Sequence, residues 1–187
     1  MKKQIHPAVF LDRDGTIIHD RNYLKDPRHI KFYRGVFPAL RLLHRGGYKL
    51  VLVTNQSGIG RGLFSRQDLR RVHHRFQQEL KGAGVRLDGI FVCPHRPEES
   101  CACRKPKLKL FLVATKRLGI DLKKSYLVGD RLSDITPARP LKSQGILVQT
   151  GLGRQQKLTS QQKRSIHRTR SLVSAARWIL NRKKRGE

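Results

Sequence analysis

The chain has 187 residues, of which 37% are hydrophobic, and this length favours one compact domain with a substantial core over two domains. Its 41 lysines and arginines outnumber its 13 acidic residues and give a net charge of +28, which attracts polyanions. Its apolar runs are too short to span a bilayer and residues 1–7 have no signal-peptide core, so we expect a cytosolic protein without a membrane partner.

The first predicted strand ends in a pair of carboxylates. Residues 9–11 are an apolar run, Val-Phe-Leu, and the turn residues Gly15 and Thr16 follow it closely. Asp12 and Asp14 lie two positions apart between the run and the turn, so both can share one edge of the strand. Two carboxylates that close need a cation between them, and one can attack or bind the cation while the other transfers a proton.

Strands and helices are expected to alternate along the rest of the chain. Short apolar runs predict further buried strands at residues 49–53, 89–92, 125–128 and 145–148. Apolar periodicity predicts helices at residues 38–44, 65–81 (capped by Ser65), 108–118 and 172–180. This alternation indicates an α/β fold with a Rossmann-like parallel sheet flanked by helices. Pro140 should shorten or kink a helix after the strand at 125–128, and the polar stretch 151–170 should be loosely held.

The loop after the strand at residues 89–92 contains all three cysteines of the chain. Cys93 and His95 are followed after five residues by Cys101 and Cys103. Three thiols and one imidazole are the donors of a closed tetrahedral zinc site, whereas a disulfide is disfavoured in the cytosol and would leave one thiol unpaired. Because protein donors would fill all four positions, we predict a structural zinc ion that fixes the loop 93–105.

Later strand ends carry groups that suit phosphate chemistry. Thr54 follows one strand, Lys105 follows the cysteine loop, and Asp130 follows the strand at 125–128. A hydroxyl, an ammonium and a carboxylate together can bind the oxygens of a phosphoryl group and a metal ion. Four of the 13 acidic residues lie in two short segments at strand ends and mark the expected cation site in so basic a chain: Asp12, Asp14, Asp130 and Asp134.

The order of these motifs resembles the haloacid dehalogenase (HAD) superfamily of phosphatases over about residues 8–150. The motifs are Leu-Asp-Arg-Asp-Gly-Thr at 11–16, Val-Thr-Asn-Gln-Ser-Gly-Ile at 53–59, the Cys-Pro-His and Cys-Ala-Cys-Arg-Lys-Pro loop at 93–106, and Val-Gly-Asp-Arg at 128–131. Together they look like the subfamily of heptose-bisphosphate 7-phosphatases and the closely related histidinol-phosphate phosphatases. The resemblance implies a HAD-like fold with no large cap domain and an inserted zinc-binding loop.

The resemblance also implies a role for each matching residue. Asp12 would attack phosphorus and become an aspartyl phosphate, and Asp14 would act as general acid and then as general base. Mg2+ would be held by the side chains of Asp12 and Asp130 and by the backbone carbonyl of Asp14. Thr54 and Lys105 would bind the phosphoryl oxygens during catalysis.

The implied substrate is a small sugar bisphosphate in a fairly open pocket. The reaction would be Mg2+-dependent hydrolysis of the 7-phosphate of D-glycero-D-manno-heptose 1,7-bisphosphate, in the route to ADP-heptose and the lipopolysaccharide core. Histidinol phosphate is the rival substrate that the core motifs permit. The resemblance implies substrate contacts from Asp20, Arg21, Asn22, Tyr23, Thr54, Asn55, Gln56, Ser57, Arg104, Lys105 and Arg131.

The C-terminal part of the chain is strongly basic. Residues 154–187 hold 11 of the 41 bases and the rest of the chain holds 30, so the positive charge is diffuse. We divide the chain into a HAD-like phosphatase domain, residues 1–153, and a basic extension, residues 154–187, whose terminal helix packs on the same domain, and we expect a monomer. With one Trp and no known binding module, nucleic acid is not the expected partner. A nucleic-acid-binding protein that acts on terminal phosphates is the alternative from a different class.

Overall fold

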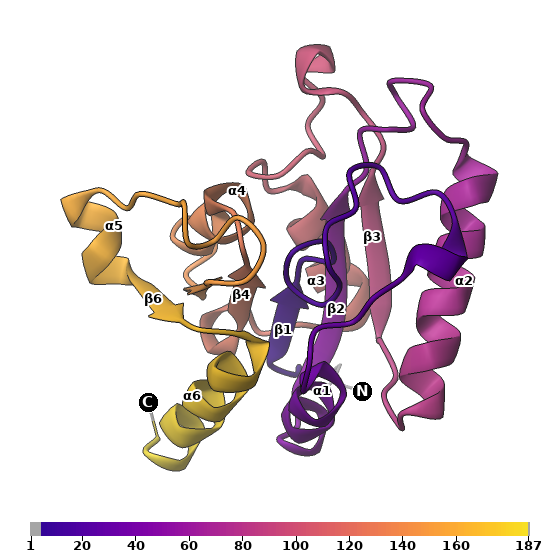
Figure 1. Ribbon diagram of the computed structural model, residues 1–187. Coiled ribbons are helices and arrows are strands. Elements are labelled where there is room, and N and C mark those ends of the chain that lie inside the picture. The colour runs from indigo at the N-terminus through magenta and orange to yellow at the C-terminus, as the bar shows by residue number, and fades with distance from the viewer. Residues whose placement is uncertain (1–4, 187) are drawn as a thin grey trace.

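The computed structural model is built around one parallel β-sheet with helices on both faces (Figure 1). It describes residues 5–186, so the first four residues of the predicted phosphatase domain and the last residue of the predicted extension lie outside the described residues. The predicted α/β fold with a Rossmann-like parallel sheet is confirmed.

The order of the strands creates a crevice beside the first strand. Within residues 5–186 the sheet has six strands in the order β3-β2-β1-β4-β5-β6, and every neighbouring pair is parallel. The chain moves outward from β1 to β3 and then returns to the other side of β1 at β4. In open parallel sheets, ligands bind at such a reversal, outside the carboxyl ends of the strands. The strands are β1 Ala8–Leu11, β2 Lys49–Asn55, β3 Gly89–Cys93, β4 Tyr126–Gly129, β5 Gln144–Val148 and β6 Ile166–Thr169.

The helices are divided unequally between the two faces of the sheet. One face packs against α1, α2 and α6, and the other packs against α3. The helices are α1 Val36–Arg45, α2 Arg66–Gly82, α3 Lys109–Leu118, α4 Leu132–Ile135, α5 Ser160–Ser165 and α6 Leu172–Lys184, and the short 3-10 turns are η1 Pro27–His29, η2 Pro97–Glu99, η3 Leu122–Lys124 and η4 Thr136–Ala138. Within residues 5–186, none of these helices combines the length and apolar character needed to cross a membrane.

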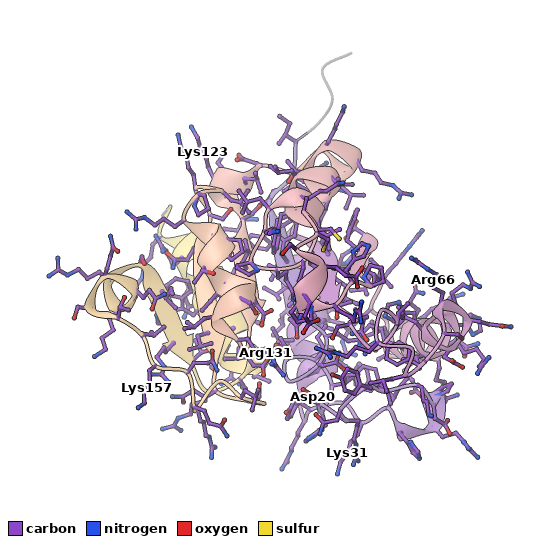
Figure 2. The ribbon with its side chains drawn as sticks, turned by 90° about the horizontal axis from the view of Figure 1, so that it is seen from above. Asp20, Lys31, Arg66, Lys123, Arg131 and Lys157 are labelled. Carbon is purple, nitrogen blue, oxygen red and sulfur yellow. The ribbon has the colours of Figure 1, made fainter. Side chains whose placement is uncertain are left out.

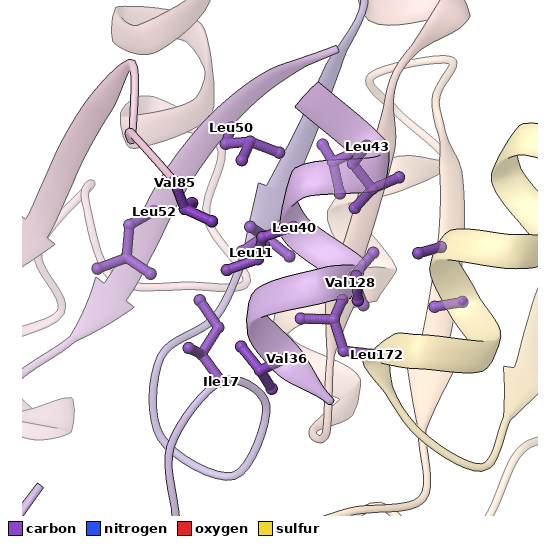
Figure 3. Packing of buried hydrophobic residues seen from close by; sticks show 14 of the residues in the cluster. Leu11, Ile17, Val36, Leu40, Leu43, Leu50, Leu52, Val85, Val128 and Leu172 are labelled. Carbon is purple, nitrogen blue, oxygen red and sulfur yellow. The ribbon is translucent and has the colours of Figure 1, made fainter. Parts of the chain in front are cut away.

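The alternation of side chains along β1 divides the core into two clusters. Val9 and Leu11 belong to the cluster with α1, α2 and α6, whereas Ala8 and Phe10 belong to the cluster with α3. All four side chains are buried, as expected for a central parallel strand. Figure 3 shows the first cluster, in which leucines from β1 and β2 meet the apolar side of α1. This packing on both faces fixes the end of β1 from which the carboxylate pair emerges.

Helix α2 begins where the sequence indicated. Ser65 caps it through a reciprocal pair of hydrogen bonds, because its hydroxyl accepts from the Asp68 backbone N–H at 3.0 Å and its own N–H donates to the Asp68 carboxylate at 2.7 Å. The apolar side of the helix is buried, with Phe76 against Phe32. His73 is also buried on this helix and faces the first carboxylate motif.

The expectation of a loosely held stretch at residues 151–170 is wrong for its second half. Residues 160–165 form α5, and β6 pairs in parallel register with β5 from Gly145↔Ile166 to Val148↔Thr169. Only Thr169 of β6 is buried, because the strand lies at the sheet edge. The sequence of β6, Ile-His-Arg-Thr, therefore shows almost no apolar pattern. Backbone hydrogen bonds to β5 stabilise this strand instead. The prediction for Pro140 agrees with the structure, since α4 has four residues and passes into η4.

Helix α6 contributes to the main core although it follows the predicted domain boundary. It contacts α1, and Ile179 is fully buried in the shared cluster.

We expect Ile179→Ala to lower the free energy of unfolding by about 2–5 kcal/mol in a single cooperative transition, because it leaves a cavity between α6 and the sheet. Chemical denaturation followed by circular dichroism measures this. The exposed Arg177→Ala on the same helix should change stability by less than about 0.5 kcal/mol. If Ile179→Ala left the main unfolding transition unchanged, this result would show that residues 154–187 fold separately from the rest of the chain.

Candidate active site

Three of the predicted site residues converge at the carboxyl edge of the sheet. Asp12 directly follows β1, Thr54 lies near the end of β2, and Asp130 directly follows β4. Because β1 pairs with both β2 and β4, these three positions are neighbours. A pocket of about 350 Å³ opens beside Asp12 and Asp14, which is within the size range of small-ligand sites.

Lys105 lies at the floor of this pocket between two carboxylates. Its Nζ lies 2.7 Å from Asp12 Oδ1 and 2.8 Å from Asp134 Oδ1, and it donates to the backbone oxygen of Val53 at 2.7 Å. The residue is only 4% exposed. Burial alone would lower the pKa of Lys105, but Asp12 and Asp134 outweigh it and raise the pKa above its ordinary value. Lys105 therefore stays charged at a fixed position beside Asp12.

The end of β2 holds the backbone of Lys105 in place. Asn55 accepts from the Lys105 N–H at 3.1 Å and donates through Nδ2 to the Lys105 carbonyl at 3.2 Å. These two bonds join the end of the cysteine loop to the sheet. The position of the ammonium group therefore depends on both the loop and the strand.

The carboxylates at this edge form a group that suits a divalent cation. Oxygens of Asp12, Asp130 and Asp134 all lie within 4.8 Å of one another. Within the described residues, the buried Oδ1 of Asp130 has no hydrogen-bond partner. Burial and then the nearby Asp134 raise the pKa of Asp130 to about 6. Burial also raises the pKa of Asp12 well above its ordinary value, although Lys105 opposes the rise. Three carboxylates beside one lysine leave an uncompensated negative charge, and oxygen donors of this kind fit Mg2+.

This cluster differs in one member from the predicted metal ligands. Asp12 and Asp130 lie together as expected, but the third side chain of the cluster is Asp134 and not Asp14. The predicted role of Asp14 in metal binding uses its backbone carbonyl, and that role stays a prediction. The sequence indicates Asp134 only as one of four acids near strand ends, and its ion pair with Lys105 depends on the turn into α4.

The glycine of the first motif is required by the close approach of Asp130. Gly15 has φ +82°, and a Cβ added there would lie 2.3 Å from Asp130 Oδ2. A residue with a side chain would therefore be strained and would also collide with the carboxylate. The turn after β1 and the carboxylate after β4 can meet only with glycine at this position.

Asp14 is oriented by two side chains next to the pocket. Gln56 Nε2 donates to Asp14 Oδ2 at 2.9 Å and to the Thr54 hydroxyl at 2.8 Å. The guanidinium of Arg13 lies against the same carboxylate, with Nη2 2.9 Å from Oδ2. Sequence reasoning missed Arg13, and the only signal was a basic residue between two acids where the chain enters a buried turn.

The four predicted zinc ligands lie together in the loop after β3. Cys101 Sγ is 3.5 Å from both Cys93 Sγ and Cys103 Sγ, and His95 Nδ1 is 3.2 Å from Cys103 Sγ and 3.7 Å from Cys93 Sγ. A tetrahedral ion with Zn–S bonds of about 2.3 Å requires separations of roughly 3.8 Å between its sulfur ligands. The donors therefore fit Zn2+, with all four positions supplied by the protein.

Most of the predicted substrate contacts line the pocket, although their contacts with substrate stay predictions. Arg131 Nη2 lies 3.3 Å from Asp20 Oδ2, and Figure 2 shows these two side chains side by side. Among the described residues, the lining does not include Arg21 or Thr54, and Thr54 lies behind it at 1% exposure. Further lining residues that the sequence did not indicate are Arg13, Leu24, Arg61, Pro97 and Ser133, and Asp134, one of the four acids expected at the cation site, lines the pocket as well. The predicted ones are Asp20, Asn22, Tyr23, Asn55, Gln56, Ser57, Arg104, Lys105 and Arg131.

Comparisons with known proteins agree with this geometry. A family model described as HAD-hydrolase-like matches residues 102–175. A D-glycero-beta-D-manno-heptose-1,7-bisphosphate 7-phosphatase from Helicobacter pylori is 46% identical over 129 residues, which cover 68% of this chain and 74% of the relative. The enzyme of the same name from Haemophilus ducreyi is 46% identical over 153 residues, which cover 77% of this chain and 84% of the relative.

Solved structures give the same result. The D,D-heptose 1,7-bisphosphate phosphatase from B. bronchiseptica, complexed with magnesium and phosphate, superposes with a TM-score of 0.85 at 33% identity, covering 94% of this chain and 99% of the other. The D,D-heptose 1,7-bisphosphate phosphatase from Burkholderia thailandensis superposes with a TM-score of 0.70 at 29% identity, covering 93% and 98%. The family resemblance predicted from the motifs is thereby confirmed, and the chain belongs to the HAD-like phosphatases.

Proposed function

We propose that this chain removes the 7-phosphate of D-glycero-β-D-manno-heptose 1,7-bisphosphate, in the route to ADP-heptose. The observation that carries the proposal is the Asp12 carboxylate, held 2.7 Å from Lys105 Nζ at the floor of a pocket that Asp14 also lines. The names of the relatives support the substrate and the β anomer. Histidinol phosphate remains the rival substrate.

In the first step, Asp12 would act as the nucleophile. A carboxylate oxygen of Asp12 attacks phosphorus, and the bond from phosphorus to the C7 oxygen breaks. The C7 oxygen takes the bonding electrons, receives a proton from Asp14 and leaves as the neutral alcohol of the sugar, while Asp14 becomes a carboxylate. Lys105 and the Thr54 hydroxyl would stabilise the charge on the remaining phosphoryl oxygens.

In the second step, Asp14 would reverse its role. Its carboxylate removes a proton from water while the water oxygen attacks phosphorus. The bond from phosphorus to Asp12 breaks, which releases phosphate and restores the Asp12 carboxylate. When bound by Asp12 and Asp130, with Asp14 contributing its backbone carbonyl, Mg2+ would neutralise part of the phosphoryl charge.

Arginines around the pocket suit the second phosphate of the substrate. Arg61, Arg104 and Arg131 all line it. Arg104 donates to the backbone oxygen of His95 at 3.2 Å, so the zinc loop helps to place its guanidinium group. We assign Arg104 to the phosphate at C1 or to the sugar next to it. In this proposal the chain works as a cytosolic monomer on a free sugar bisphosphate and not on nucleic acid.

The nucleophile assignment is tested by substitution. We expect the chain with Mg2+ to release phosphate from the heptose bisphosphate and Asp12→Asn to lose at least about 10³-fold in kcat, because an amide cannot form the aspartyl phosphate. A colorimetric phosphate assay measures this. Asp121→Asn is a matched control, because asparagine caps the turn at η3 as well as aspartate does. No release by the native chain, or full activity in Asp12→Asn, would contradict the proposal.

The substrate is tested with a panel of heptose bisphosphate, histidinol phosphate and a 5′-phosphorylated oligonucleotide. We expect kcat/KM to be highest for the heptose bisphosphate, because histidinol phosphate has no second phosphate for the arginines and the further phosphates of the oligonucleotide are diesters within a polymer. Arg104→Met should lower kcat/KM for the bisphosphate by about 10- to 100-fold, the value of a charged hydrogen bond, and affect a sugar monophosphate little. Preference for histidinol phosphate would select the rival enzyme. Preference for the oligonucleotide, with strong salt dependence, would select a nucleic-acid enzyme.

We predict that the cysteine loop binds a zinc ion and that loss of this ion loosens the active site. Purified chain should contain one zinc per molecule, measured by plasma emission spectrometry, and Cys101→Ser should reduce this content strongly. Chelation followed by the return of Mg2+ alone should lower the melting temperature and also the activity, because the loop ends at Lys105. Ser100→Ala, next to the ligand but outside the cluster, should keep the zinc. Full activity in a zinc-free chain would show that the loop does not depend on the metal.

A further inference from the structure

We propose that Arg13 is a positioning residue for Asp14: its buried guanidinium holds the Asp14 carboxylate in the orientation needed for proton transfer to the leaving oxygen. The proposal rests on the function proposed above, in which Asp14 is the general acid and base. It concerns a residue that no part of that mechanism uses. It also gives the sequence Asp-Arg-Asp a physical reason for its middle residue.

The contacts of the guanidinium group define the arrangement. Arg13 Nε donates to both oxygens of Asp14, at 3.2 and 3.1 Å, and Nη2 lies 2.9 Å from Oδ2. Nη2 also donates to Gln56 Oε1 at 3.0 Å, and Nη1 lies 3.1 Å from His73 Nε2. Each end of the planar fork is thus occupied by a partner from a different part of the chain. Gln56 and His73 fix the orientation of the Arg13 guanidinium group. Arg13 can therefore fix the orientation of the Asp14 carboxylate.

The environment of Arg13 explains why these contacts are firm. The residue is 1% exposed, whereas the side chain of Asp14 is 21% exposed toward the pocket. A guanidinium group cannot lose its charge, so its burial must be compensated by acceptors. Burial and the Arg13 charge lower the pKa of His73 to about 3, which keeps the imidazole neutral and able to accept the Nη1 proton. Arg13 therefore has an acceptor on α2 that helps to keep its plane fixed.

Gln56 closes the network on the side of the substrate. It accepts from Arg13 Nη2 and donates to both Asp14 Oδ2 and Thr54 Oγ1. The carboxylate proposed for proton transfer and the hydroxyl predicted to bind phosphate are thus connected through one amide. A shift of Arg13 would release Asp14 from its orientation while Asp12 stays in its ion pair with Lys105.

Arginine is the side chain that these acceptors require. A lysine would keep the positive charge, but its three donors radiate from one nitrogen and cannot match a carboxylate, an amide oxygen and an imidazole nitrogen spread along a plane. Charge alone would therefore restore only part of the arrangement. This distinguishes positioning from simple compensation of the Asp14 charge.

The test uses the dependence of the reaction on the leaving group. A good leaving group such as p-nitrophenolate departs without a proton, whereas phenolate needs one from a general acid. We therefore compare kcat/KM, which reports on the step that expels the leaving group, across substituted phenyl phosphates from p-nitrophenyl phosphate to phenyl phosphate. Arg13→Met should lose about 10- to 100-fold on phenyl phosphate and less than about 3-fold on p-nitrophenyl phosphate, so its plot against leaving-group pKa becomes steeper. Arg13→Lys should give an intermediate slope.

Two further variants separate positioning from a general role in folding. Arg41→Met removes another partly buried guanidinium, which donates to the backbone oxygen of Ala83, and should leave the slope unchanged. His73→Leu removes the acceptor of Nη1 on α2 and should steepen the slope in the same direction as Arg13→Met, but less. If Arg13→Met does not fold, the slope of His73→Leu still tests the proposal. An equal loss on all esters, or a native slope in both Arg13→Lys and His73→Leu, would overturn the proposal.

The outcome for this inference can be told apart from the outcome for the proposed substrate. A native chain that cleaves aryl phosphates but not heptose bisphosphate would overturn the substrate and leave the slope measurements valid. A native chain that cleaves heptose bisphosphate, with Arg13 variants that lose all esters equally, would overturn only the role of Arg13. A chain inactive on every ester would overturn both.

Discussion

The accumulation of buried carboxylates at one edge of the sheet is the constraint on which the rest of the site depends. Oxygens of Asp12, Asp130 and Asp134 lie within 4.8 Å of one another, and Lys105 forms ion pairs with two of these residues, Asp12 and Asp134. Like charges at this distance raise the energy of the folded state unless a cation neutralises them. The hydrophobic core of the parallel sheet offsets this cost. Strand β1 is buried on both faces and cannot move away from the other carboxylates.

The surrounding segments can be understood as means of keeping that edge in place. Gly15 allows the turn after β1 to touch Asp130, and Asn55 binds the backbone that carries Lys105. The cysteine loop brings Lys105 to the edge from β3, which pairs with β2 and not with β1. A loop of this length would be mobile without internal support, and four metal donors supply that support without a large core.

The sequence predicted the parts of the site that follow directly from strand ends. Asp12, Thr54 and Asp130 could be placed because an apolar run shows where each strand stops, and parallel strands meet at one edge. The ion pair of Lys105 with Asp134 and the contacts of Arg13 with His73 and Gln56 could not be predicted, because they join segments up to 60 residues apart whose meeting depends on helix packing. The edge strand β6 was missed for a related reason. Its stability comes from backbone pairing with β5, which leaves no apolar pattern in its side chains.

The charge of the whole chain and the charge of the site act in opposite directions. Lys31, Arg66, Lys123 and Lys157 extend from different sides of the molecule in Figure 2, so basic side chains are not confined to one face of this chain, whose net charge is +28. A diffuse positive field attracts a doubly phosphorylated sugar from any direction, and salt screens that attraction beyond about 10 Å. Within the pocket, however, the carboxylates repel the same phosphates. The arginines that line the pocket and Lys105 at its floor are therefore needed to convert a general attraction into binding at Asp12. Only the specific placement of these groups can discriminate between phosphate esters.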